Sequence, residues 1–533
     1  MLKKLSEFTL EKKQYWLLIA LVLSTGFSMA SLNTFQIGTY MDDAWYINTA
    51  TALATGQGFS RIWFPQPVPE TNLPIGYPLA LSVIRLFFPQ SFLPLQLFSL
   101  LCVLVTLYLS VKVFDAYLSP FLYITYIFLV SVNTNIVGAS HQVMSEAFYL
   151  MLTFIVFALV QASEHSGQQK WLAIICAFVA TYGFFTRGWG GALVVSLVAY
   201  WLINKKWKSA LFTVLIFVAS VILWSWRNAS LGGSGVINNL GADSDAVRWY
   251  VGRLLNSVST LDDVFLDQMS TIIMPLFLGP RFLQFFGAAR LMFVPYLLAA
   301  SVSLAIVAGW IRHFISGRGI LMNLYVFFYL LILIQAPGLR YWIPLIPFVI
   351  YYFLIGVEWG IQVICDRIRK PLWAPFMALA IFSMVFILHL GRDFQGILDP
   401  VRNRIPDVAS GSTWIADNTP DDAIVMALVP RVSYLYSSRK TIPYPDAGDT
   451  HLFPMIELTS TGKKERFIES IDFYQVSYVL VEPMLRSGLP MEWSPYIQED
   501  IIPVLEENPL RFRLVYRNAD DKVRIYQVAH EQN

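Results

Sequence analysis

Residues 15–32 read YWLLIALVLSTGFSMASL, an apolar run that approaches the ~20 residues a helix needs to cross a bilayer. The run is too long for a signal-peptide core and has no clear small-residue cleavage site, so we expect a retained membrane span. The positive-inside rule predicts a cytoplasmic N-terminus, because four lysines precede the run: Lys3, Lys4, Lys12 and Lys13.

Further apolar runs of similar length follow along the chain. They lie at 92–111, 117–136, 145–163, 171–186, 189–203, 209–226, 291–311, 320–336, 341–361 and 372–391. With 56% hydrophobic and only 14% charged residues among 533, the sequence predicts an α-helical polytopic membrane protein with about 11 transmembrane helices. The short loops that carry basic residues all fall on the cytoplasmic side, as the positive-inside rule requires, and the odd number of spans places the C-terminus outside.

The loops between the spans predict where function lies. Two outer loops are long, 33–88 and 227–290, and the apolar stretch 77–88 within the first suits a juxtamembrane helix better than a span. We therefore expect a membrane domain at 1–391 and a small soluble α/β domain at 392–533 on the outer face. In the second domain, strand-like runs lie at 423–429, 476–481, 512–516 and 523–528, and helical patterns lie at 407–417 and 462–472.

Charge and cysteine content exclude several classes of protein. A formal net charge of +2, without a basic segment interleaved with aromatics, argues against a nucleic-acid partner. The cysteines all lie in or beside apolar segments, so neither a disulfide framework nor a cysteine-based zinc site is expected: Cys102, Cys176 and Cys365.

Two adjacent acids stand out in the first outer loop, in the sequence TYMDDAWY at 39–46. Asp42 and Asp43 precede a helical pattern that Gly56 and Gly58 end, so they are expected at the N-terminus of a surface helix. Helix capping explains one carboxylate at that place. Two exceed what a cap needs, which favours a chemical role.

Three further ionisable residues lie at predicted outer ends of spans. Glu146, in HQVMSEAFY at 141–149, either caps a helix together with Ser145 or has a function at the edge of the hydrocarbon. Arg187 in TRGWGG and Arg340 in GLRYWIPLIP either reach outward to lipid headgroups or bind a lipid phosphate with their planar donor groups.

Together these motifs resemble the GT-C superfamily of membrane glycosyltransferases, and most of all its protein mannosyltransferase and aminoarabinose transferase branches. The resemblance rests on the order of the acidic pair, NLPIGYP at 72–78, Ser-Glu, Thr-Arg-Gly and Arg-Tyr-x-x-Pro-x-x-Pro. It covers the chain to about residue 391 and continues less specifically beyond. The family often carries Asp-Glu at the first motif, and related transferases often have Lys-Pro-Pro where this chain has Asn-Leu-Pro, so a lysine role there does not transfer.

The resemblance implies roles for individual residues. The catalytic base would be Asp42 or Asp43, of which we favour Asp42. Arg187, Arg340 and Tyr341 would bind the donor phosphate. Supporting roles toward substrate or metal would belong to Glu146, His141 and Tyr77. Asp43 and Glu146 are candidate ligands for a divalent cation, although no histidine or cysteine cluster demands one.

The implied activity is transfer of a sugar from a polyprenyl-phosphate donor to a hydroxyl of a lipid, glycan or protein acceptor, in or at the plasma or inner membrane. A phosphate leaving group needs cations rather than a general acid, so one carboxylate base suffices for an inverting single displacement. The main alternative is a transporter or flippase of lipid-linked glycans, and a third is a binding protein. Ion-driven transporters usually carry ionisable residues within the membrane, whereas here the acids gather in the outer loops.

Overall fold

The computed structural model describes most of the predicted spans and most of the C-terminal region. The described residues are 13–32, 37–165, 169–231, 293–333, 339–368, 373–398, 407–445, 460, 462–483 and 493–530. The predicted outer loop at 227–290 lies outside the described residues beyond Leu231.

The chain forms two compact units. The first contains residues 1–32, 71–77 and 96–398, and the second contains residues 33–70, 78–95 and 399–533. Most of the predicted first outer loop therefore belongs to the same unit as the C-terminal part of the chain, a relationship that hydropathy does not indicate. The division into functional domains at residue 391 stays a prediction.

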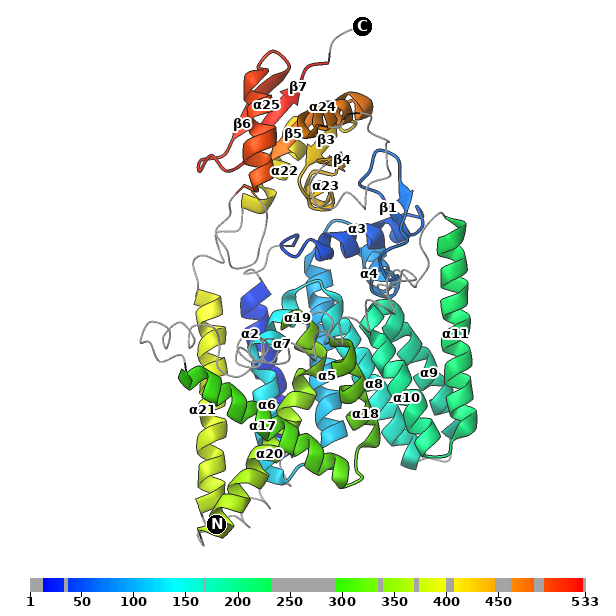
Figure 1. Ribbon diagram of the computed structural model, residues 1–533, viewed down its shortest axis with the longest axis vertical. Coiled ribbons are helices and arrows are strands. Elements are labelled where there is room, and N and C mark those ends of the chain that lie inside the picture. The colour runs from blue at the N-terminus through cyan, green and yellow to red at the C-terminus, as the bar shows by residue number, and fades with distance from the viewer. Residues whose placement is uncertain are drawn as a thin grey trace. The chain divides into compact units, whose positions relative to one another are not determined.

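The first unit is built of apolar helices. They are α2 (Lys13–Ser31), α5 (Leu93–Phe114), α6 (Pro120–Ser131), α7 (Thr134–His141), α8 (Ser145–His165), α9 (Gln169–Thr186), α10 (Gly191–Ile203), α11 (Trp207–Ser230), α17 (Phe293–Ile315), α18 (Ile320–Leu333), α20 (Ile346–Arg367) and α21 (Ala374–Leu398). Helices α8, α9, α10 and α11 lie side by side (Figure 1). Short turns lead into α10 and α20: η2 (Gly188–Gly190), α19 (Leu339–Trp342) and η4 (Ile343–Leu345).

Every predicted span corresponds to a helix or a pair of helices. Among the described residues, 7 helices are long and apolar enough to cross a membrane, or up to 8 if a bent pair counts as one span. Helices α9, α10 and α18 are apolar but shorter. The mostly helical, polytopic fold predicted from the sequence is confirmed, and the chain is an integral multi-pass membrane protein.

The span predicted at 117–136 is not straight. Helices α6 and α7 meet at an angle of 47°. Asn133 produces the break, because its side chain accepts hydrogen bonds from the backbone N–H groups of Asn135 and Ile136 and so begins a new helix. Sequence hydropathy does not register such a break, since both helices are apolar.

The second unit contains a mixed five-stranded sheet in the order β4-β3-β5-β7-β6 (Figure 1). Its strands are β3 (Ile424–Ala427), β4 (Lys440–Pro443), β5 (Tyr478–Val481), β6 (Phe512–Arg517) and β7 (Arg524–Val528). Strand β3 is parallel to β4 and β5, and β7 is antiparallel to β5 and β6. The associated helices are α22 (Asp407–Asn418), α23 (Pro430–Ser437), α24 (Lys463–Tyr474) and α25 (Ile502–Glu507).

Both faces of this sheet are covered. Val425 and Leu480 pack with Ile415 of α22 on one face, while Val479 packs with Phe467 of α24 on the other. The alternation follows from the two-residue repeat of a β-strand. The predicted α/β domain is confirmed, and β4, α23 and α25 are additions that the sequence pattern did not reveal.

Residues 33–70 and 78–95, most of which lie in the predicted first outer loop, complete the second unit. Helix α3 (Asp42–Ala54) is followed by a short antiparallel pair, β1 (Ser60–Arg61) and β2 (Val68–Pro69). Helix α4 (Gly76–Phe87) forms where a juxtamembrane helix was predicted. Ala44 of α3 belongs to the same hydrophobic core as the sheet residues Met426 and Val479.

Candidate active site

The acidic pair lies at the beginning of α3, as predicted. Asp43 is fully buried, and its carboxylate accepts hydrogen bonds from the backbone N–H groups of Gly38 at 2.7 Å and Ala44 at 2.9 Å. Burial raises the pKa of Asp43 to about 7, because removal from water disfavours the charged form, although the two hydrogen bonds act in the opposite direction. Asp42 keeps part of its surface exposed.

The difference in burial distinguishes Asp42 from Asp43, which the sequence alone did not distinguish. Asp43 holds the turn before α3 together, because its carboxylate binds the backbone N–H of Gly38, five positions earlier in the sequence. Asp42 is the member of the pair whose side chain is partly exposed. The assignment of the base remains a prediction, and the burial pattern favours Asp42 for it.

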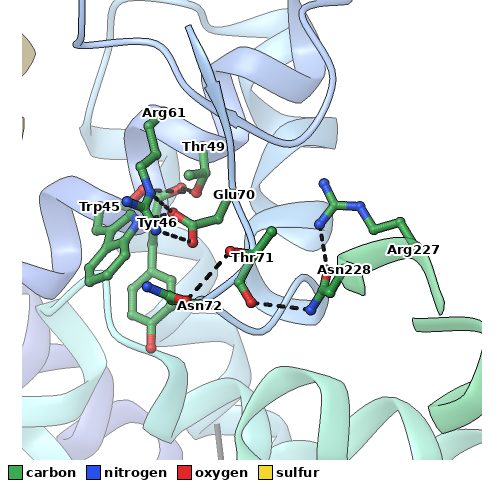
Figure 2. Close-up of polar contacts among 9 residues, drawn as sticks. All are labelled: Trp45, Tyr46, Thr49, Arg61, Glu70, Thr71, Asn72, Arg227 and Asn228. Atoms are coloured by element: carbon green, nitrogen blue, oxygen red, sulfur yellow. Dashed lines mark hydrogen bonds and ion pairs between the residues drawn. The ribbon is translucent and has the colours of Figure 1, made fainter. Parts of the chain in front are cut away.

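A buried ionic contact supports the next turn of α3. Figure 2 shows the side chains of Trp45, Arg61 and Glu70 pointing toward one another. The Trp45 Nε1 donates to the Glu70 Oε2 at 2.6 Å. Arg61 pairs with both carboxylate oxygens of Glu70, through Nε at 2.9 Å and Nη2 at 3.2 Å. Glu70 is 0% exposed, so this forked pair supplies the charge compensation that its burial requires.

In the first unit, Glu146 and Arg187 form a buried ion pair. Helix α8 begins at Ser145, which places Glu146 in its first turn, and Arg187 stands between α9 and η2. The Arg187 Nη1 lies 2.8 Å from the Glu146 Oε1, with side-chain exposures of 7% and 2%. The same Nη1 donates to the Ser145 Oγ at 3.2 Å. Capping alone does not explain Glu146, because its carboxylate pairs with a distant arginine.

Arg340 and Tyr341 join this pair. The Arg340 Nε lies 3.9 Å from the Glu146 Oε1, and 37% of the Arg340 side chain is exposed. The guanidinium groups of Arg187 and Arg340 each lie 5.1 Å from the centre of the Tyr341 ring. Trp189 stacks on that ring at 4.8 Å with an interplanar angle of 12°. Two guanidinium groups, one carboxylate and two aromatic rings thus form a compact positively charged cluster.

The NLPIGYP segment lies against the chain that leads to Arg187. A Cβ atom at Gly76 would come within 2.7 Å of the backbone of Phe185 and Thr186, so only glycine permits this approach. The Tyr182 hydroxyl donates to the Gly76 carbonyl at 2.7 Å. Tyr77 is fully buried, and its ring centre lies 6.0 Å from that of Phe148 on α8. The segment therefore supports the helix ends that carry the cluster.

Polar contacts fix the beginning of the same segment. The Asn228 Nδ2 donates to the Thr71 carbonyl at 3.1 Å, and Arg227 donates to the Asn228 Oδ1 at 2.8 Å (Figure 2). Asn228 is close to the C-terminal end of α11. The segment is thus held between α9 and α11.

His141 is the last predicted site residue. It ends α7 and is buried, and its carbonyl accepts a hydrogen bond from the Gln96 Nε2 at 3.1 Å. This contact joins α7 to α5 through the backbone of residue 141. A role toward substrate stays a prediction.

The two carboxylates proposed as cation ligands have other partners. Glu146 faces Arg187 and Arg340, and Asp43 accepts two backbone N–H groups. A divalent cation needs several oxygen ligands and is repelled by nearby guanidinium groups. Across the part of the chain that the structure describes, no group of three or more His, Cys, Asp or Glu side chains is placed to hold a metal ion. A role of Asp43 and Glu146 toward a divalent cation stays a prediction.

Some residues of the site were missed in the sequence. Glu70 and Arg61 lie in the predicted first outer loop, where an acid two residues before NLPIGYP was a usable signal. Trp189 stands within TRGWGG, and a tryptophan beside an arginine at a helix end suggested stacking. Arg431 of α23 gave no local signal, because its contacts to the first outer loop are set by packing alone.

Comparison with known proteins agrees with this architecture. No family model matches the chain, and no curated protein matches its sequence. The chain is similar in structure to ArnT from Cupriavidus metallidurans bound to undecaprenyl phosphate, with TM-score 0.58 and 12% identity over 97% of this chain and 98% of that one. It is also similar to the Archaeoglobus fulgidus oligosaccharyltransferase in complex with Zn and sulfate, with TM-score 0.54 and 13% identity over 96% of this chain and 73% of that one.

Both neighbours are members of the GT-C superfamily. The chain therefore has the GT-C fold, and the resemblance inferred from its motifs is confirmed at the level of fold. The apo form of the same ArnT matches with TM-score 0.53 at 11% identity over 96% of this chain.

Proposed function

We propose that this protein is a glycosyltransferase that takes a sugar from a polyprenyl-phosphate donor and transfers it to an acceptor hydroxyl. The observation that carries the proposal is the cluster of Arg187, Arg340, Tyr341 and Glu146 at the ends of apolar helices in a GT-C fold. The ArnT neighbour holds undecaprenyl phosphate, which supports a lipid phosphate as the leaving group here as well.

The cluster suits a phosphate on a lipid. Arginine presents several N–H donors in one plane, a geometry that matches phosphate oxygens. Arg187 is almost fully buried and already paired with Glu146, while Arg340 keeps 37% of its side chain exposed. In this proposal Arg340 contacts the phosphate directly, with Tyr341 beside it. Arg187 holds Tyr341 and Glu146 in place and adds positive charge.

The chemical step is a single displacement. The acceptor hydroxyl oxygen forms a bond to the anomeric carbon, the bond from that carbon to the phosphate oxygen breaks, and the hydroxyl proton passes to the Asp42 carboxylate. The polyprenyl phosphate leaves with the bonding electron pair, and the arginines stabilise its negative charge. One displacement inverts the anomeric carbon. Glu146 acts by holding Arg187 in position. Tyr77 acts by holding the 72–78 segment in position.

The reaction is assigned to the outer face of the membrane, with the N-terminus in the cytoplasm and residues 392–533 outside. The positive-inside distribution of Lys and Arg supports this orientation. The acceptor is a lipid, a glycan or a protein, and the C-terminal residues either cover the site or select that acceptor.

Purified protein in lipid, supplied with a panel of polyprenyl-phosphate sugars and acceptors, tests the proposal. We expect release of lipid phosphate in proportion to transfer, with inversion at the anomeric carbon measured by NMR. The Arg340→Ala variant should raise the donor KM and lower turnover, because the phosphate contact acts on the bound donor and on the leaving group. The variant Gly26→Ala is the control, since a Cβ there meets open space.

A transporter or flippase would give a different result when the same purified protein is supplied with the same lipid-linked sugars. Proteoliposomes would then move a lipid-linked sugar between leaflets without breaking its bond to phosphate. Translocation without any release of lipid phosphate from the whole panel would overturn the transferase proposal.

A further inference from the structure

Arg431 contacts α3, the helix that carries the acidic pair, from the C-terminal part of the chain. It lies in the first turn of α23 and is 7% exposed. Its Nε donates to the Met41 carbonyl at 3.2 Å, and its own carbonyl accepts from the Asn48 Nδ2 at 2.8 Å. Its guanidinium lies 5.2 Å from the centre of the Trp45 ring.

These three contacts follow one side of α3. Met41, Trp45 and Asn48 are spaced by four and three residues, the spacing at which helical side chains share a face. Arg431 thus touches the beginning, the first turn and the second turn of the helix.

The contact to Met41 falls at a strained point of the backbone. Met41 has φ 61°, a left-handed conformation that costs a non-glycine residue roughly 1–2 kcal/mol. Such a conformation persists only where surrounding contacts hold it. Met41 precedes Asp42 directly and caps α3 without a side-chain hydrogen bond. The direction of the Asp42 side chain therefore depends on what holds Met41.

The Trp45 ring has a second cation beside it, Arg61. The Arg61 guanidinium lies 5.7 Å from the same ring, and the Trp45 Nε1 is bound to Glu70. Arg61 and Glu70 belong to the same loop as Asp42, whereas Arg431 is 390 residues away from Met41 in sequence. Arg431 is the contact of Trp45 that ties α3 to the C-terminal part of the chain.

We propose that Arg431 is a positioning residue for Asp42: it holds Met41 and Trp45 so that the Asp42 carboxylate faces the reacting hydroxyl. This inference rests on the proposed function. In this inference the C-terminal part of the chain helps to position α3, in addition to covering the site or selecting an acceptor.

Arg439 provides a matched control for the test. It is equally buried at 8% exposure and lies in the same part of the chain. Its contacts stay within the C-terminal part: its Nη2 donates to the carbonyls of Ala416 at 3.0 Å and Thr419 at 2.8 Å, and its Nη1 pairs with Asp421. A loss of stability alone should affect both arginine variants, whereas a loss of positioning should affect only Arg431.

The first measurement is turnover per folded molecule in full-length protein. We expect Arg431→Gln to lower kcat by ~10²-fold with the donor KM unchanged, as for a misplaced catalytic group. Arg431→Lys should have a kcat between those of Arg431→Gln and the wild type, because lysine keeps the positive charge but lacks the planar donor group. In an Asp42→Asn background, Arg431→Gln should cause no further loss. A full additional loss in that background, or an equal loss from Arg439→Gln, would overturn the inference.

The second measurement does not need activity. Amide hydrogen exchange over residues 42–48 should become about tenfold faster in Arg431→Gln and stay unchanged in Arg439→Gln, since only the first removes contacts of α3. Unchanged exchange in Arg431→Gln refutes the positioning role whether or not the protein transfers sugar. If exchange is faster in Arg431→Gln but the wild type shows no transferase activity, the contact between Arg431 and α3 is supported and the proposed function is refuted.

Discussion

The Arg187 Nη1 lies 2.8 Å from the Glu146 Oε1, with both side chains almost fully buried. The two residues come from the ends of different helices, α9 and α8. A buried ion pair of this kind is costly to break but contributes little net stability when both charges are removed together. That asymmetry gives a direct test of its role.

Glu146→Gln should destabilise the protein by about 3–5 kcal/mol, because it leaves the Arg187 charge buried without its carboxylate. The double variant Glu146→Gln with Arg187→Met should regain much of that stability yet remain defective in transfer. Thermal unfolding in lipid nanodiscs and the transfer assay measure the two effects. A double variant as active as the wild type would contradict a role of this pair in donor binding.

Asp42→Asn should keep the fold and the binding of lipid phosphate but lower turnover by roughly 10²–10⁴-fold, the usual effect of losing a general base. Because the Asp42 side chain is partly exposed, the substitution should change the free energy of unfolding only slightly. Turnover and equilibrium binding of polyprenyl phosphate are measured on the same preparation. Near-normal turnover would move the base to Asp43 or refute the enzyme proposal.

Asp43 should make stability depend on pH. Burial raises the pKa of its carboxyl from 3.8 to about 7, so the folded protein retains a proton that the unfolded chain loses at lower pH. This stabilisation is fully present below about pH 4 and is lost as the pH rises through about 7.

Between about pH 5 and pH 7 the loss is on the order of 2 kcal/mol. Asp43→Asn should remove this component, so its unfolding free energy should vary less over that range than that of the wild type. Denaturant unfolding followed at several pH values checks the slope. Parallel curves for the two proteins would show that Asp43 does not titrate there.

Gly76→Ala should disturb the support of the arginine cluster. The added Cβ would lie 2.7 Å from the backbone of Phe185 and Thr186, neither of which moves easily. We expect a loss of stability on the order of 1–3 kcal/mol and a loss of turnover of ~10²-fold. Gly26→Ala, where the added atom meets nothing within 4 Å, should have neither effect. Equal behaviour of the two variants would contradict the close approach.

The orientation in the membrane is tested with single cysteines in a background without the buried native thiols, which are Cys102, Cys176 and Cys365. Cysteines at the exposed positions Gln57 and Leu510 should react with an impermeant thiol reagent from outside, while one at exposed Lys208 should not. Labelling of intact cells followed by mass shift is the measurement. Reaction at Lys208 from outside would invert the topology.

Much of the local structure was predictable. The apolar runs form helices, the acidic pair opens α3 and Glu146 opens α8, because helix length and helix termini depend on a few neighbouring residues. The α/β character of the C-terminal region followed from alternating apolar residues. Strand β4 escaped prediction, because its sequence KTIP contains a lysine and a proline and has no run of apolar or β-branched residues like those of β3 and β5.

The sequence by itself thus determined the membrane class, the approximate positions of the spans and the residues at their ends, since all of these follow from local hydropathy and helix capping. Only the tertiary structure decided that Glu146 pairs with Arg187, that Asp43 is buried while Asp42 is not, and that Arg431 reaches Met41. Each of these joins segments that are distant in sequence or depends on their packing. Such contacts are fixed by the shape complementarity of whole helices and sheets, which no short stretch of sequence contains.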